Sequence, residues 1–140
     1  MWRGWCHVHD DFRAAEIAEI RAENPGSVLM AHPESRREVL EIADVVTSTS
    51  GMLRYPAGSD ATTFIVATET GLLYRLGLLY PDKRFIPASS RAVCPNMKLT
   101  TLEKCIATLD DEWDDVLEHE VTVPAQIRLK ALLAVERMIA

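Results

Sequence analysis

The amino-acid sequence predicts an α/β fold of three layers, α/β/α, with a short parallel sheet of about four strands and additional C-terminal helices. Two observations carry this prediction. Four short apolar segments have strand character, and a helical pattern separates each from the next. Because parallel strands need a crossover to return to the same edge of a sheet, the alternation indicates parallel pairing with right-handed crossovers.

The expected strands follow from composition. Residues 27–31 form an apolar run typical of a buried parallel strand, and residues 63–67 are rich in β-branched and aromatic side chains. Residues 45–48 and 84–87 give two further, weaker strands.

The expected helices lie between the strands. The first starts near Asp10, with Asp10 or Asp11 as its N-cap, and stops at Asn24-Pro25-Gly26. Residues 36–43 and 72–79 have helical patterns, with a short helical turn around Met52 between them. Beyond residue 93 we expect a helix over about 101–109, a solvated acidic turn at 110–115 and an amphipathic helix opened by Pro124.

Composition limits the function. A chain of 140 residues is long enough for one well-packed domain and too short for a second full one. Its net charge is -6, with 15 Lys and Arg scattered among 21 Asp and Glu, which argues against nucleic-acid binding. No apolar run approaches a membrane span and no secretory signal precedes Cys6, so we expect a cytoplasmic protein that does not enter membranes.

Polar residues follow three of the expected strands at the point where each strand ends. In an open α/β sheet, ligands collect beyond the carboxyl ends of the strands. We therefore expect three pairs to face one rim of the sheet: His32 and Glu34, Ser48 and Thr49, and Thr68 and Glu69.

Candidate catalytic residues are His32 and Glu34, where one side chain can act as a hydrogen-bond donor or acid and the other as a carboxylate base. A simpler interpretation makes His32 a strand-end residue and Glu34 a first-turn helix charge. Ser48 and Thr49, followed by Gly51, resemble a small loop that binds a phosphate or carboxylate, although Ser and Thr are also ordinary N-caps.

The chain has three cysteines, an odd number at wide spacing that fits a reducing compartment. Cys6 and Cys94 precede helical patterns and are candidate metal ligands, whereas Cys105 lies within a helical pattern and is expected to be a small buried residue. His7 and His9 crowd next to Cys6, so a zinc site built from Cys6, a histidine and Cys94 is one alternative. For His9, a supporting or surface position is favoured over a ligand role.

Together these motifs resemble the quinolinate synthase family, the A protein of bacterial NAD biosynthesis. The resemblance runs from about Trp2 to the C-terminus in the family's order. It rests on Trp2-x-Gly4-Trp5-Cys6-His7-Val8-His9, His32-Pro33-Glu34-Ser35, Ala43-Asp44, Ser48-Thr49-Ser50, Ala67-Thr68-Glu69-Thr70-Gly71, Tyr74-Arg75-Leu76, Pro81-Asp82-Lys83 and Cys94-Pro95-Asn96-Met97-Lys98.

The resemblance implies a protein of three similar α/β domains around a four-iron, four-sulfur cluster held by three cysteines. Such an enzyme condenses iminoaspartate with dihydroxyacetone phosphate to form quinolinate. By resemblance, Cys6 and Cys94 are the second and third cluster ligands. His32 and Glu34 contact substrate as acid and base, and Ser48 and Thr49 bind its carboxylate or phosphate. Residues 1–93 then resemble the last complete domain, and residues 94–140 are a ligand loop and helical tail that packs on this domain or on a missing one.

One part of the family pattern is absent from these residues. The first cluster cysteine has no counterpart here, so the sequence resembles the C-terminal part of the family, as a truncated reading frame or one piece of a split enzyme. A missing N-terminal region or a partner chain would supply the third thiol. The alternatives are a non-catalytic zinc-binding module and an inactive fragment.

Overall fold

The structure, a computed structural model, describes residues 4–109 and 121–139 and divides the chain into two units, residues 1–95 and 96–140. Unit 1 contains the four-stranded parallel sheet that the sequence predicts, and its strand order is β2-β1-β3-β4. The strands are β1 (Val28–Ala31), β2 (Val45–Val46), β3 (Thr63–Ala67) and β4 (Arg84–Pro87). The expected boundaries are confirmed within two residues.

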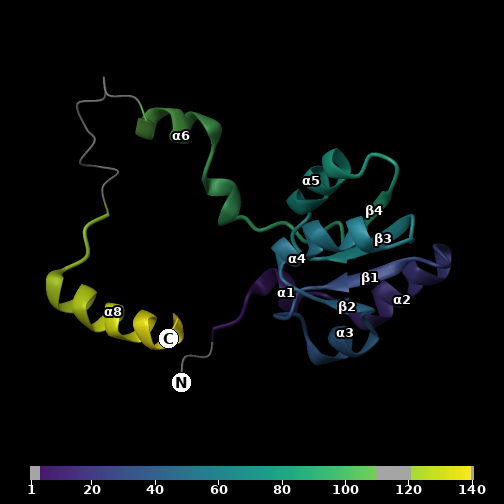
Figure 1. Cartoon of the computed structure of the whole chain (residues 1–140), viewed down its shortest axis with the longest axis horizontal. Coiled ribbons are helices and arrows are strands. Elements are labelled where there is room, and N and C mark those ends of the chain that lie inside the picture. Colours follow the sequence, from purple (N-terminus) through teal and green to yellow (C-terminus); the bar gives the residue numbers. More distant parts are fainter. Residues whose placement is uncertain (1–3, 110–120, 140) are drawn as a thin grey trace. The chain divides into compact units, whose positions relative to one another are not determined.

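Helices cover both faces of this sheet, which gives the three predicted layers (Figure 1). α2 (Ala14–Glu23) and α3 (Arg37–Ile42) pack on one face together with the short α1 (His7–Asp10). α4 (Thr49–Arg54), the 3-10 turn η1 (Tyr55–Gly58) and α5 (Gly71–Leu79) lie on the other side.

Strand periodicity divides the core between these two faces. Successive side chains of a strand point to opposite sides of the sheet. Leu29 and Ile65 therefore pack with Ile17 and Val39 from α2 and α3, whereas their chain neighbours point to the other face. On that other face the fully buried side chains are Met30, Met52, Phe64, Val66 and Leu76.

The start of the first long helix differs from the sequence expectation. α2 begins at Ala14, and its N-cap residue Arg13 makes no side-chain cap hydrogen bond. Asp10 belongs instead to α1, where its carboxylate accepts two hydrogen bonds from Arg36, each 3.0 Å long. The Asp10 carboxylate, which the local sequence pattern assigned to an N-cap, therefore binds Arg36, a residue distant in the sequence.

The stop of α2 agrees with the sequence. Asn24 donates a side-chain hydrogen bond to the carbonyl of Ile20, and Gly26 has a φ of 80°. That backbone conformation carries little penalty for glycine and is strained for most other residues, so the turn into β1 depends on this position.

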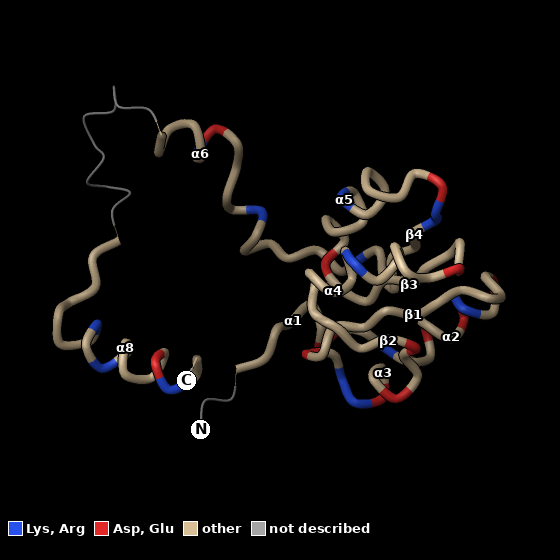
Figure 2. Tube along the Cα trace, viewed as in Figure 1, with Lys and Arg blue, Asp and Glu red and all other residues tan. Residues whose placement is uncertain are grey.

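Basic and acidic residues are interspersed along the backbone of unit 1 (Figure 2), and several of them form ion pairs. Arg21 forms two 2.7 Å hydrogen bonds with the Asp44 carboxylate, which also accepts the backbone N–H of Leu29. This network ties α2 to the segment between β1 and β2.

Unit 2 contains the 3-10 turn η2 (Met97–Leu99), α6 (Leu102–Leu109) and α8 (Ala125–Ile139). The expected acidic turn at 110–115 lies outside the described residues. Cys105 on α6 is exposed, so the expectation of burial is wrong; none of the described residues of α6 is buried. Among the described residues, no helix is both long and apolar enough to cross a bilayer.

The core of unit 1 yields a first prediction. Leu29→Ala, at a side chain that is 0% exposed, should lower the free energy of unfolding by about 2–5 kcal/mol, because it removes buried methyl groups and leaves a cavity. The control Leu78→Ala, at a side chain that is 66% exposed, should change it by no more than about 0.5 kcal/mol. Urea unfolding followed by circular dichroism measures both, and equal effects would contradict the assigned core.

Candidate functional site

The three polar pairs do lie at one rim of the sheet. Ala31, the last residue of β1, is paired in register with Val46 of β2 and Ala67 of β3. His32, Thr47 and Thr68 come directly after these three aligned positions, so the segments that they begin leave the sheet side by side. The expected position of these residues at one rim is thus confirmed.

The rim includes the topological switch point of the sheet. The chain leaves β1 toward β2 through α3, and it leaves β3 toward β4 through α5 on the opposite face. Connections that diverge from two adjacent parallel strands open a crevice above them, and ligands of open α/β sheets bind there. His32 and Thr68 follow the two strands that flank this point.

His9 of α1 joins the two strand ends. Its Nδ1 lies 3.0 Å from Oε2 of Glu34, and its Nε2 lies 2.9 Å from Oγ1 of Thr68. The His9 and His32 rings are stacked, with centroids 4.2 Å apart and planes 7° from parallel. His9 is only 7% exposed, so the surface position that the sequence left open for it is wrong.

The electrostatic surroundings of His9 favour its neutral form. Burial lowers the pKa of His9 and the neighbouring His32 lowers it further, against the opposing effect of the Glu34 carboxylate. A neutral imidazole has one donor nitrogen and one acceptor nitrogen, which matches its two partners.

Arg36 and Asp10 make a second connection between α1 and the loop after β1. Arg36 holds the pKa of the Asp10 carboxyl below its ordinary value, chiefly through its hydrogen bonds. The sequence gives little sign of this pair, since the two residues are 26 positions apart and neither pattern requires the other.

Glu69 is almost fully buried at the end of β3, and both its carboxylate oxygens accept backbone N–H groups. Oε2 accepts from Gly71 at 2.7 Å, at the start of α5, and Oε1 accepts from Cys94 at 3.4 Å. Glu69 therefore links the end of β3 to the backbone of the candidate ligand Cys94.

All three cysteines are free, and Cys6 and Cys94 are half-buried. Both pack against the same apolar cluster, which includes Val8 and Ala92. Ligand atoms of Cys6, His9 and Glu34 lie within 4.8 Å of one another. The structure thus places both candidate thiols on the core cluster next to the rim, with Cys6 beside the histidine site.

Ser48 and Thr49 start α4 and are exposed. The Ser48 hydroxyl accepts the Gly51 N–H at 3.3 Å, which is the N-cap arrangement that the sequence left open as an alternative. A Cβ at position 51 would collide with the side chain of Thr47, so this turn needs a glycine.

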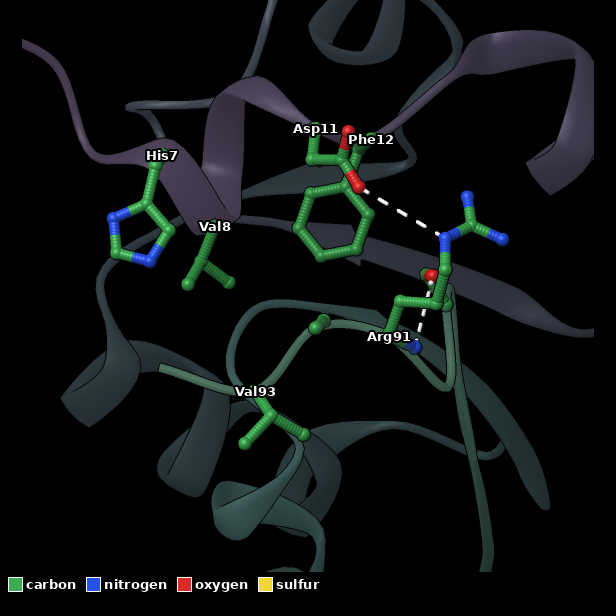
Figure 3. Close-up of a pocket in the computed structure, with 8 residues that line it drawn as sticks. His7, Val8, Asp11, Phe12, Arg91 and Val93 are labelled. Carbon is green, nitrogen blue, oxygen red and sulfur yellow. Dashed lines mark hydrogen bonds and ion pairs between the residues drawn. The ribbon is translucent and has the colours of Figure 1, made fainter. Parts of the chain in front are cut away.

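A separate pocket of about 270 Å³ lies between α1 and the segment after β4 (Figure 3). His7 lines it and Arg91 borders it, with an Arg91 Nε to Asp11 Oδ2 distance of 4.0 Å. Neither His32 nor Glu34 contributes to this pocket. Its lining consists of His7, Val8, Asp11, Phe12, Ser89, Arg91, Ala92 and Val93.

Fold and site together define a class: an α/β protein with a histidine–carboxylate site at the switch point of a parallel sheet and two free thiols nearby. Comparison with known proteins specifies the family. The model of the family described as "Quinolinate synthetase A protein" matches residues 1–140, and the chain belongs to this family.

Individual relatives agree with the assignment. Quinolinate synthase from Geobacter metallireducens is 45% identical over 140 residues, and that from Dehalococcoides mccartyi strain CBDB1 is 44% identical over 138 residues, 99% of this chain. Quinolinate synthase 2 from Methanosarcina acetivorans is 40% identical over 137 residues, 98% of this chain. The chain spans 44% of the length of the first two relatives and 43% of the third.

The Asp10–Arg36 pair gives a second prediction. Because the pKa of Asp10 is lower in the folded than in the unfolded protein, this carboxylate favours folding at neutral pH, and its contribution is lost as the pH falls through the folded pKa. Asp10→Asn should therefore destabilise unit 1 at neutral pH, and its difference from wild type should shrink in acid.

Carboxyl chemical shifts of Asp10 and pH-dependent unfolding test this. Arg37→Gln is a suitable control, since Arg37 pairs with Glu41 on the surface of α3. An Asp10 that titrates at its ordinary value in the folded chain would contradict the prediction.

Proposed function

We propose that the chain supplies part of the active site of a quinolinate synthase, which condenses iminoaspartate with dihydroxyacetone phosphate to quinolinate in NAD biosynthesis. The single observation that carries this proposal is the grouping of His9, His32, Glu34 and Thr68 at the switch point in a member of this family. Because the chain spans less than half the length of its relatives, the complete reaction is assigned to the assembly of this chain with the remaining region.

In this proposal the rim residues handle substrate charge and protons. Glu34 has an exposed carboxylate, 57% exposed as a side chain, that can accept a proton from substrate, and His32 lies beside it as a donor. Ser48 and Thr49 offer exposed hydroxyls on the adjacent segment for a substrate carboxylate or phosphate. Dehydration and ring closure both need such proton transfers.

The free thiols fit the expected iron–sulfur cluster. Cys6 and Cys94 are half-buried and pack against the same apolar cluster, and cysteine thiolates are the usual ligands of iron–sulfur clusters. When bound by three cysteines, a four-iron, four-sulfur cluster supplies an open iron that acts as a Lewis acid on a substrate hydroxyl or carboxylate. Cys6 and Cys94 would hold two of its irons, and the third thiol would come from outside these 140 residues.

A zinc-binding module is the second candidate, favoured by the proximity of Cys6, His9 and Glu34. Against it, both ring nitrogens of His9 already have hydrogen-bond partners. Metal binding through either nitrogen would break one of these bonds, so the cysteine-based cluster accounts better for the site.

Metal content distinguishes the two candidates. After anaerobic reconstitution with iron and sulfide in the presence of the remaining family region, Cys6→Ser and Cys94→Ser should each lose most of the bound iron and labile sulfide. Cys105→Ser, on the separate α6, should retain both. Stoichiometric zinc without labile sulfide, lost on His9→Gln, would support the zinc module instead.

Activity tests the proposed reaction. A chimera in which this chain replaces the matched region of the Geobacter metallireducens protein should form quinolinate, whereas the chain by itself should form little or none. In the chimera, Glu34→Gln and His32→Asn should each lower kcat by about 10²–10⁴-fold, as expected for lost proton transfer. Full turnover by the isolated chain, or unchanged kcat in both variants, would refute the assignment.

A further inference from the structure

We infer that His9 is a positioning residue that holds Glu34 as a proton acceptor. In this arrangement its ring proton is on Nδ1, and Thr68 fixes the ring by donating its hydroxyl hydrogen to Nε2. The inference deepens the proposed function, on which its catalytic consequence rests, by assigning the direction of each hydrogen bond that holds the Glu34 carboxylate.

The ring proton of His9 follows from the hydrogen bond to Glu34. An ionised carboxylate can only accept hydrogen bonds, so the nitrogen 3.0 Å from Oε2 of Glu34 must be the donor. Nδ1 therefore carries the proton. In a neutral ring Nε2 is then an acceptor, and the hydroxyl of Thr68, 2.9 Å away, must donate to it.

His32 has the opposite arrangement of donor and acceptor nitrogens. The backbone N–H of Glu34 donates to Nδ1 of His32 at 3.3 Å, so this nitrogen is the acceptor of that ring. A neutral His32 then carries its proton on Nε2, for which no hydrogen bond is found within the described part of the chain. The separation of 3.7 Å between His32 Nδ1 and Glu34 Oε2 is too long for a hydrogen bond.

The stacked rings of His9 and His32 therefore have different hydrogen-bonding roles. His9 directs its N–H at the Glu34 carboxylate, and His32 keeps an N–H available for a ligand. This arrangement agrees with Glu34 as the acceptor and His32 as the donor in the proposed reaction. The sequence alone leaves this assignment open, since either residue type can be acid or base.

His9 also limits the orientations that the Glu34 carboxylate can adopt. The Glu34 side chain is 57% exposed, and an exposed carboxylate without a fixed partner rotates freely. His9 is buried and is held by Thr68 at the end of a central strand, so it transmits the rigidity of the sheet to Glu34. The Asp10–Arg36 pair ties α1 to the loop after β1, and within the described residues it is His9 that donates a hydrogen bond to the Glu34 carboxylate itself.

Nitrogen-15 spectra of the isolated chain test the proton positions without any need for activity. The His9 resonances, assigned with His9→Gln, should show a protonated Nδ1 and an acceptor Nε2. Thr68→Val removes the hydroxyl at nearly constant volume and should abolish the fixed tautomer, whereas Thr68→Ser should preserve it. Because a Thr68 variant could fail to fold, Glu34→Ala at the exposed partner is a second test and should give fast exchange of the Nδ1 proton.

The chimera then tests the catalytic consequence. Thr68→Val should lower kcat by about tenfold, the value of one lost hydrogen bond, with KM changed less, and Thr68→Ser should restore kcat to within about threefold. A His9 proton on Nε2, or unchanged tautomer and kcat in Thr68→Val, would overturn the inference. An inactive wild-type chimera with the expected tautomers would instead refute the proposed function and leave the positioning role of His9 supported.

Discussion

The parallel pairing of β1 with β3 is the constraint on which the rest of unit 1 depends. Val28 to Ala31 pair residue by residue with Phe64 to Ala67, although the two strands are separated by more than 30 residues. This register places His32 and Thr68 directly beyond equivalent strand ends, within reach of one imidazole. A shift of one residue would turn each side chain of a strand to the other face of the sheet. The packing of the two helical layers against these side chains therefore maintains the register.

The direction of the connections adds to this effect. α3 returns the chain over one face of the sheet and α5 returns it over the other, so the segments after β1 and β3 diverge immediately. The side chains of these two diverging segments face the crevice that opens between them. His9 enters this space from α1, which lies outside the β–α–β units and can therefore contact both strand ends at once.

Sequence patterns were sufficient for the sheet and for the rim. Short apolar runs give strand positions because burial on both faces requires apolar residues throughout, and polar strand ends give candidate site residues because topology aligns them. The patterns were insufficient for His9, Arg36 and Cys105. The contacts of His9 with Thr68 and of Arg36 with Asp10 span many residues, and periodicity carries no information about such pairs. For Cys105 the helical pattern correctly gave the element, whereas exposure depends on what covers it.

Surface loops usually tolerate changes of length, and the segment from Ala88 to Cys94 has the irregular backbone of such a loop. Its backbone is nevertheless tied at three points: Ala88 N–H donates to Val66, Ala92 accepts from Thr70, and Cys94 N–H donates to Glu69. These bonds fix the number of residues that can separate the end of β4 from the thiol. The hydrogen bonds therefore fix the length of this segment. A single inserted residue would displace the Cys94 sulfur while leaving the sheet intact.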